Sequence, residues 1–305
     1  CFGVCVSKRI YSKLYLSNQT SNTKFKFYYF NPDIRAKTGL DTITLTNLVI
    51  DEVSPDIIFL FDCYATKHNS RVGRVVEVKN KALRPASAVE GYDDKIISKN
   101  GAKIIENLDF KTRKEKALSL FSENDIFINE GIACKEAQMG FQTLAKEIKV
   151  QSKALGREFD IFLPAGTGVS ALYLAKFSKC RVFTCACVGD ENYLKRQMLE
   201  LEPNFCIKLL DKNSFSLSNS SHKGLFILKT PKKFHFAKPH KELLNIYQRA
   251  LKECEIEFSL LYDSVGLHTM LFYKTHFHKP ILYIHQGGLN ANASMLERYE
   301  FKGLL

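Results

Sequence analysis

A glycine-bearing segment in the middle of the chain carries residue types that could bind a phosphate group. It follows the apolar run Phe159–Leu163 and opens a helix predicted over Ser170–Phe177. The segment consists of Gly166, Thr167, Gly168, Val169 and Ser170. Glycines allow unusual φ angles and close backbone approach, and the free N–H groups and dipole of a helix start favour an anion. The spacing therefore predicts a phosphate site; a tight strand-to-helix turn without a ligand is the other interpretation.

The kind of phosphate is less tightly constrained by this segment. It lacks the Gly-Lys-Ser/Thr ending of a P-loop, which disfavours ATP or GTP at this loop. Gly166-x-Gly168-x-x-Ala171 matches a relaxed dinucleotide fingerprint, and Asp190 lies near the position expected for a ribose contact. A nucleotide-binding, Rossmann-like protein therefore remains an alternative.

Two other groups of residues invite a metal-site interpretation that their surroundings do not support. Cys185 and Cys187 form C-x-C in an apolar run, where we expect small buried thiols on one face of a strand. His276 and His278 have no third ligand nearby in the sequence. We therefore predict no metal site. The N-x-S/T triplets at Asn18, Asn219 and Asn292 are expected to be chance matches.

The elements that must position these residues alternate regularly after about residue 97. We predict strands over Ala102–Ile105, Asp125–Ile128, Phe159–Leu163, Arg181–Val188, Ser259–Tyr262 and Pro280–His285. We predict helices over Arg113–Phe121, Lys135–Ser152, Ser170–Phe177, Asn192–Leu201, Lys241–Cys254, Val265–Tyr273 and Ala293–Tyr299. This alternation indicates an α/β fold with open, twisted, mostly parallel sheets flanked by helices.

The first 96 residues are harder to interpret. Strand-like runs occur at Phe25–Phe30, Thr42–Ile50, Asp56–Phe61 and Val75–Val78, with few helical patterns between them. We therefore divide the chain into residues 1–96, a divergent or incomplete N-terminal segment, and residues 97–305, an α/β cofactor-binding region.

Composition narrows the classes of function. The 305 residues are 45% hydrophobic and 25% charged, as in ordinary globular proteins, and the net charge is +12. The densest basic segment, Lys229–Lys241, has no nucleic-acid-binding motif around it, so a nucleic-acid partner is not expected. No apolar run approaches the roughly 18 residues of a membrane helix. We expect no membrane partner and a cytoplasmic location.

Five segments, taken together, resemble a known family. They are NGAKIIE, INEGIACKEAQMGFQTLAKEI, FDIFLPAGTGVSALYLAK, CVGDENYLKRQM and YIHQGGLNANASMLERY. In type and order they resemble the 1-aminocyclopropane-1-carboxylate deaminase and D-cysteine desulfhydrase family, over about two thirds of the chain. The resemblance implies the tryptophan synthase β-like fold (fold type II), two subdomains, pyridoxal 5'-phosphate as cofactor and a homodimer.

The resemblance also implies roles for individual residues. Gly166 to Ser170 would hold the cofactor phosphate, Gln286 would contact the pyridine nitrogen, Gly287 would be a further cofactor-binding residue, and Glu130 would lie near the ring. Lys81 would form the Schiff base. The residues implied in substrate binding are Ser17, Asn18, Gln19 and Tyr262.

The sequence departs from the family pattern in three places. Lys81 lacks the preceding Ser-Gly, Ser17–Gln19 lacks preceding glycines and comes before the lysine instead of after it, and Gly266 stands where the family has an active-site Tyr. The implied function is a lyase or deaminase acting on a small amino acid, like D-cysteine desulfhydrase or 1-aminocyclopropane-1-carboxylate deaminase. Without the lysine the chain would be inactive, so a non-catalytic relative is a further alternative.

Overall fold

The computed structural model divides the chain into two compact units, which we describe separately. The larger unit comprises residues 2–40 and 138–305, and the smaller unit comprises residue 1 and residues 41–137. The structure describes residues 25–28, 57–60, 74–80, 103–107, 113–120, 125–128, 131, 133–154, 156, 158–217, 223–254, 257–286, 289 and 291–305.

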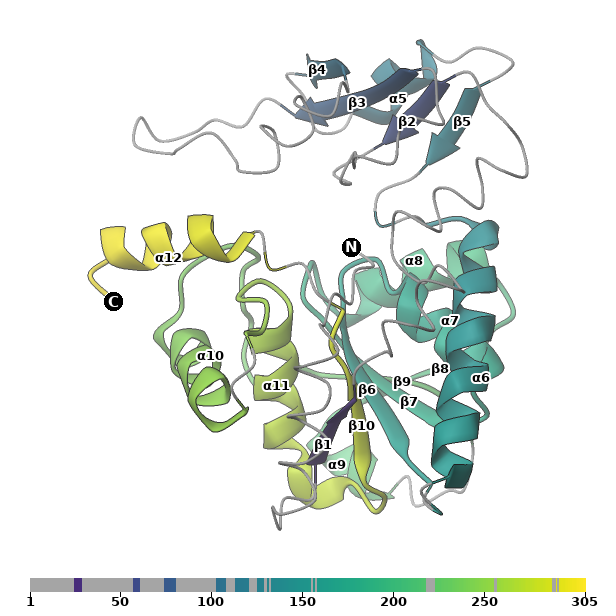
Figure 1. Ribbon diagram of the computed structural model, residues 1–305, viewed down its shortest axis with the longest axis vertical. Coiled ribbons are helices and arrows are strands. Elements are labelled where there is room, and N and C mark those ends of the chain that lie inside the picture. Colours follow the sequence, from purple (N-terminus) through teal and green to yellow (C-terminus); the bar gives the residue numbers. More distant parts are fainter. Residues whose placement is uncertain are drawn as a thin grey trace. The chain divides into compact units, whose positions relative to one another are not determined.

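A parallel sheet forms the centre of the larger unit (Figure 1). Its strands are β1 (Phe25–Tyr28), β6 (Asp160–Ala165), β7 (Arg181–Ala186), β8 (Ile207–Leu210), β9 (Gly224–Leu228) and β10 (Ile281–Ile284). They lie in the order β1-β10-β6-β7-β9-β8, and each neighbouring pair is parallel. The carboxyl ends of all these strands therefore meet at one edge of the sheet.

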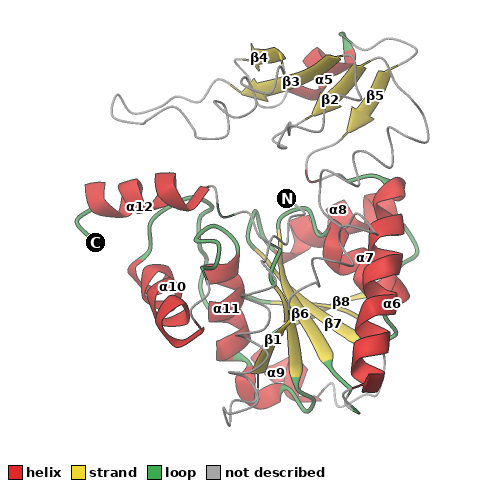
Figure 2. Ribbon diagram, in the orientation of Figure 1, coloured by secondary structure: helices red, strands yellow, loops and turns green. Residues whose placement is uncertain are grey.

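Helices cover both faces of this sheet (Figure 2). They are α6 (Gln138–Ala154), α7 (Val169–Phe177), α8 (Glu191–Leu201), α9 (Lys212–Leu217), α10 (Lys241–Cys254), α11 (Asp263–Phe272) and α12 (Ala291–Phe301). Helices α7 and α8 pack against β7 and β9, with α6 against α7. Helix α11 contacts β6 and β7, with α10 against it. Short 3₁₀ turns occur at Lys135–Ala137 and Lys274–His276.

The central strands are buried on both faces, as their nearly continuous apolar runs predict. All residues of β6 and β10 are buried, as are five of the six in β7. The rings of Phe162 on β6 and Tyr283 on β10 stack with centroids 5.8 Å apart. This buried core positions the loops that follow the strands.

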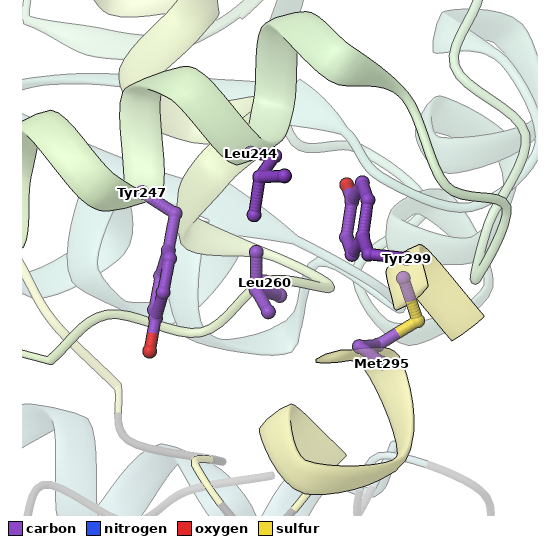
Figure 3. Packing of buried hydrophobic residues seen from close by; sticks show 5 residues of the cluster. All are labelled: Leu244, Tyr247, Leu260, Met295 and Tyr299. Atoms are coloured by element: carbon purple, nitrogen blue, oxygen red, sulfur yellow. The ribbon is translucent and has the colours of Figure 1, made fainter. Parts of the chain in front are cut away.

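A second apolar cluster joins α10 to α12 (Figure 3). It consists of Leu244, Tyr247, Leu260, Met295 and Tyr299. The hydroxyl of Tyr299 donates to the carbonyl oxygen of His240 at 3.2 Å, which ties the C-terminal helix to the start of α10. Leu260 contributes from the turn before α11, so this cluster also supports that turn.

The smaller unit contains a second parallel sheet. Its strands are β2 (Ile57–Leu60), β3 (Arg74–Asn80), β4 (Lys103–Asn107) and β5 (Asp125–Ile128), in the order β4-β3-β2-β5. Helix α5 (Arg113–Leu118) packs against β3. Both sheets are parallel, which confirms the α/β class expected from the alternation of strands and helices.

Most of the predicted elements are present. The bounds of β5 and α10 match the prediction at both ends. The strand predicted over Ser259–Tyr262 is wrong, because these residues form a turn. The hydroxyl oxygen of Ser259 accepts the N–H groups of Leu261 and Tyr262, which bends the backbone out of an extended path. The prediction also missed β8, α9 and β9.

Several predictions fall on residues that the structure does not describe. The strand predicted over Thr42–Ile50 lies there. The proposed division at residues 96 and 97 stays a prediction, since most of residues 1–96 lie there too. Within the described ranges, no helix has the length and hydropathy needed to cross a membrane.

Candidate functional site

The glycine-bearing loop joins the carboxyl end of β6 to α7, as the sequence predicts. Gly168 is the N-cap of α7, with φ 82° and ψ 1°, and no side chain caps this helix start. The first turn closes when the N–H of Leu172 donates to the carbonyl oxygen of Gly168 at 2.9 Å. The N–H groups of Val169, Ser170 and Ala171 precede this bond and have no acceptor within the helix.

Gly168 is required by both backbone conformation and packing. Its positive φ belongs to the left-handed region, which side chains disfavour. A Cβ atom there would lie 2.3 Å from Cε of Met198 and 2.9 Å from Cδ1 of Leu194, both on α8. The absence of a side chain therefore lets α8 pack directly against the loop and holds the start of α7 in place.

Tyr262 lies against the same loop. A Cβ atom at Gly166 would lie 3.3 Å from Cε1 of Tyr262, so the ring occupies the space beside the glycine. The ring of Phe236 lies 5.5 Å from that of Tyr262, centroid to centroid. The structure thus places one sequence-predicted site residue, Tyr262, next to the predicted cradle.

Two hydroxyl groups add donors to the loop. Thr167 and Ser170 are half-buried, and neither side chain makes a hydrogen bond within the part of the chain that the structure describes. Free helix N–H groups, a glycine without a side chain and two available hydroxyls are the groups that bind a phosphate oxygen. The loop therefore fits a phosphate-bearing cofactor.

Gln286 follows β10 at the same edge of the sheet. Its Nε2 donates to the carbonyl oxygen of Pro164 at 2.8 Å, near the end of β6. A carbonyl only accepts, so this bond fixes which way the amide points. One N–H and the Oε1 atom of Gln286 remain for another partner. The side chain therefore presents a neutral donor and acceptor close to the glycine-bearing loop.

A buried polar hub holds this edge of the sheet together. The carboxylate of Asp263, at the start of α11, accepts from Nδ1 of His285 at 2.8 Å, from the hydroxyl of Tyr283 at 2.8 Å and from the N–H of Ser259 at 2.9 Å. Burial, together with the neighbouring Asp263 carboxylate, raises the pKa of Tyr283 well above its ordinary value, so its hydroxyl keeps the proton that it donates. The sequence placed His285 in the segment YIHQGGLNANASMLERY but did not predict its contact with Asp263, because 21 residues separate them in the chain.

Gly266 allows a close approach between α11 and β6. A Cβ atom there would lie 2.8 Å from the hydroxyl oxygen of Tyr283 and 3.0 Å from Cβ of Pro164. An aromatic side chain does not fit at this position, because Tyr283 and Pro164 already fill the space. The packing around Gly266 therefore excludes the aromatic side chain that the family pattern has at this position.

Two other polar residues that the sequence analysis named have structural roles. The carboxylate of Asp190 accepts the N–H of Tyr193 at 2.7 Å and caps α8. Asn292 is buried; its Oδ1 accepts the N–H of Leu260, and its Nδ2 donates to Glu257 and Phe258.

The two cysteines of the C-x-C pair are buried free thiols, as expected. Burial raises the pKa of the Cys187 thiol well above its ordinary value, which disfavours a reactive thiolate. Among the described residues, no group of three or more His, Cys, Asp or Glu side chains could hold a metal ion. His276 and His278 are therefore not part of such a group.

The remaining predicted site residues lie outside the described residues. They are Lys81, Ser17, Asn18, Gln19, Glu130 and Gly287. Their roles stay predictions from the family resemblance. The structure brings together Gly166, Thr167, Gly168, Val169, Ser170, Tyr262 and Gln286.

Comparison with solved structures identifies the fold. A homologue of ACC deaminase is similar over 96% of this chain and 100% of its own, with a TM-score of 0.58 and 14% sequence identity. Holo diaminopropionate ammonia lyase from Escherichia coli is similar over 99% of this chain and 95% of its own, with a TM-score of 0.55 and 12% sequence identity. The chain has the tryptophan synthase β-like fold. A pyridoxal 5'-phosphate-dependent aspartate racemase is also similar, with a TM-score of 0.53 and 11% identity over 94% of this chain and 90% of its own.

Sequence comparisons add little to this structural likeness. No family model matches the chain. The germination protease of Caldanaerobacter subterraneus subsp. tengcongensis is 28% identical over 60 residues, which are 20% of this chain and 18% of the protease. The match spans less than a fifth of that relative, so it supports no conclusion about this chain. The tryptophan synthase β-like fold therefore rests on the structural likeness alone.

Proposed function

We propose that this chain binds pyridoxal 5'-phosphate and acts on a small amino acid as a lyase or deaminase. The observation that carries the proposal is the loop from Gly166 to Ser170 at the carboxyl end of β6, where an uncapped helix start and two free hydroxyls offer the donors that a phosphate needs. The fold supports the same assignment, since three solved structures that share it are an ACC deaminase homologue, an ammonia lyase and a pyridoxal 5'-phosphate-dependent racemase.

In this proposal the chain's own residues bind and orient the cofactor. The N–H groups of Val169, Ser170 and Ala171 and the hydroxyls of Thr167 and Ser170 hold the phosphate. Gln286 offers its remaining N–H or Oε1 to the ring nitrogen, and the family resemblance assigns Glu130 and Gly287 to the same cofactor site. When bound, pyridoxal phosphate acts as an electron sink for charge that develops on the substrate.

The substrate side of the proposal rests on residues from the family resemblance. Lys81 attaches the cofactor and moves protons, Ser17, Asn18 and Gln19 bind the substrate carboxylate, and Tyr262 is a further substrate-binding residue. Gly266 leaves no aromatic hydroxyl at its position, which favours a D-cysteine desulfhydrase-like reaction over opening of a cyclopropane ring. We further propose that the protein forms a homodimer. Size-exclusion chromatography with light scattering measures its mass in solution and tests this.

Cofactor binding is the direct test. Equilibrium dialysis with pyridoxal phosphate should show saturable binding, and Thr167→Ala or Ser170→Ala should weaken it about tenfold, the effect of losing a hydrogen bond to a charged group. Thr275→Ala removes an exposed threonine from another part of the larger unit and is the matched control. Equal binding by all four proteins would contradict the assignment of the loop.

Covalent attachment separates the proposal from its alternatives. Borohydride treatment of the loaded protein should leave a stable adduct on Lys81, detected by peptide mass, and Lys81→Ala should abolish it. Binding without any adduct favours a non-catalytic relative. Thermal protection by a dinucleotide, but not by pyridoxal phosphate, would instead support a nucleotide-binding protein.

A further inference from the structure

A basic cavity lies at the opposite edge of the large sheet from the glycine-bearing loop. Its volume is about 1130 Å³. Helix α6 forms one wall, and the segments that precede β6, β7, β9 and β10 form the rest. In Figure 1 the last turn of α6 lies at the end of the unit where β6 and β7 begin. Since β6 has six residues, its length of roughly 20 Å separates this cavity from the loop.

Positive side chains dominate the lining of this cavity. Seven lysines and arginines line it: Lys146, Lys149, Lys153, Lys179, Arg181, Lys223 and Lys279. Glu158 is the acidic side chain among the described lining residues. The excess of six positive charges within one cavity is half of the net charge of +12 carried by the whole chain. The cavity is therefore a strong local attractor for anions.

Ion pairs neutralise only part of this charge. Lys279 pairs with Glu158 at 2.5 Å, and Arg181 pairs with Asp160. The other five lysines make no ion pair within the described part of the chain. Three of them, Lys146, Lys149 and Lys153, are spaced three and four residues apart on α6 and so share one face of the helix. Like charges at this spacing repel each other, and a bound anion would reduce this repulsion.

The backbone at Lys179 adds an independent observation. Lys179 lies in the turn between α7 and β7 with φ 57°, a left-handed conformation that favours glycine or asparagine. A lysine at such a position is strained, and strained residues cluster at ligand-binding sites. Lys179 is also one of the residues that line the cavity.

The cavity also has an apolar part. Ala145 and Ile148 of α6 are buried and line it, together with buried Phe159 and half-buried Phe177. A ligand that is only a charge would leave this surface uncovered. A volume of about 1130 Å³ also exceeds what a single phosphate ion fills.

We propose that this cavity binds a small polyphosphorylated molecule with an aromatic or apolar body, of the nucleoside triphosphate class. The phosphates bind the unpaired lysines at the rim, and the body covers the apolar part formed by α6 and Phe159. The site is separate from the proposed cofactor site, and it leaves both the Gly166–Ser170 loop and the carboxyl edge of the sheet untouched.

The test is binding of ATP to the full chain at low salt without added Mg²⁺, measured by calorimetry. We expect saturable binding that weakens when NaCl rises from about 50 to about 200 mM, because salt screens charges. Tripolyphosphate should bind more weakly than ATP, and adenosine should not bind. Equal affinity of tripolyphosphate and ATP would overturn the role of the apolar part, and absence of ATP binding would overturn the site.

Charge-removing variants locate the binding. Lys149→Gln should weaken ATP binding about threefold to fivefold, the effect of losing an exposed ion pair, and should not lower stability, because it removes a repulsion on α6. Lys179→Asn keeps a left-handed backbone without the charge and should weaken binding similarly. The control Lys233→Gln removes an exposed lysine from the basic segment Lys229–Lys241.

The control also separates this proposal from general attraction. If Lys233→Gln weakens ATP binding as much as Lys149→Gln does, the cavity is not the site. If a single-stranded oligonucleotide competes with ATP and binds more tightly, the surface serves nucleic acid and the proposal fails. Thr167→Ala, in the glycine-bearing loop, should leave ATP affinity unchanged; a loss there would place ATP in the loop instead.

Discussion

The carboxylate of Asp263 accepts a hydrogen bond from Nδ1 of His285 at 2.8 Å, and both side chains are buried. Asp263 also accepts from Tyr283 and Ser259, so one carboxylate joins the start of α11 to the end of β10. Replacing Asp263 by Ala removes the acceptor shared by three buried donors. We expect a loss of ~3–5 kcal/mol in the free energy of unfolding, measured by urea denaturation.

Two comparisons test that interpretation. Asp263→Asn should cost less than Asp263→Ala, because the Tyr283 hydroxyl can reverse and accept from the new amide. Glu200→Gln, at an exposed position on α8, should change stability by less than ~0.5 kcal/mol. If Asp263→Ala cost no more than Glu200→Gln, the hub would not stabilise the fold.

The hydroxyl of Tyr283 should contribute through Asp263 in particular. Tyr283→Phe keeps the ring stacked on Phe162 but removes one donor to the carboxylate, and we expect a loss of ~1–2 kcal/mol. In a double-mutant cycle with Asp263→Ala, the two losses should differ from additivity by at least ~0.5 kcal/mol. Additive losses would mean that the hydrogen bond makes no net contribution.

Gly168 and Gly156 form a matched pair for separating packing from backbone strain. Both have positive φ, at 82° and 58°, but a Cβ atom would clash with Met198 only at Gly168, and at Gly156 it would meet nothing within 4 Å. Gly156→Ala should cost ~1 kcal/mol from strain alone, and Gly168→Ala ~2–4 kcal/mol. Thermal denaturation of both variants measures the difference. Equal losses would contradict the close packing of α8 on the loop.

Glu147 should make stability depend on pH. It is buried on α6 without a hydrogen-bond partner among the described residues, and burial raises its pKa from 4.5 to about 7. The folded state therefore favours the protonated form of Glu147. The contribution of this group to the free energy of unfolding is fully present below pH 4.5 and is lost as pH rises through about 7. Glu147→Gln should stabilise the protein by up to ~3 kcal/mol at pH 8 and have little effect at pH 4.

Glu158 supplies a control of opposite sign. Its hydrogen bond and ion pair with Lys279 lower its pKa, so the charged form is favoured in the folded state. Its contribution is therefore present above its ordinary pKa and lost as pH falls. Urea denaturation across pH 4 to 8 should show Glu158→Gln slightly destabilising at high pH, where Glu147→Gln stabilises. The same sign for both variants would contradict the assignment.

Asn292 should be necessary for the turn before α11. Its amide bonds Leu260, Glu257 and Phe258 at 2.8–2.9 Å. Asn292→Ala removes the side-chain partner of buried backbone groups in this turn, so we expect a loss of ~2–4 kcal/mol. Asn245→Ala, at an exposed position on α10, is the control and should cost well under ~1 kcal/mol. Urea denaturation measures both.

Local patterns predicted the elements of this fold where one physical preference dominated. Continuous apolar residues identified β6, β7 and β10, and helical periodicity identified α10 at both ends. The prediction failed at Ser259–Tyr262, where apolar residues look like a strand but a serine hydroxyl and Asp263 bind the backbone in a turn. Such side-chain hydrogen bonds compete with the backbone bonds of a strand, and they depend on side-chain positions that cannot be read from apolar periodicity.

The sequence by itself determined the parallel α/β class and the glycine-bearing loop, because apolar periodicity and the special conformations of glycine are local properties. The tertiary structure alone decided that Asp263 meets His285 and Tyr283, that Tyr262 lies beside Gly166, and that lysines from α6 and from the starts of several strands surround one cavity. These contacts join residues far apart in the chain. They exist because the packing of parallel strands brings all strand ends of one kind to the same edge of a sheet.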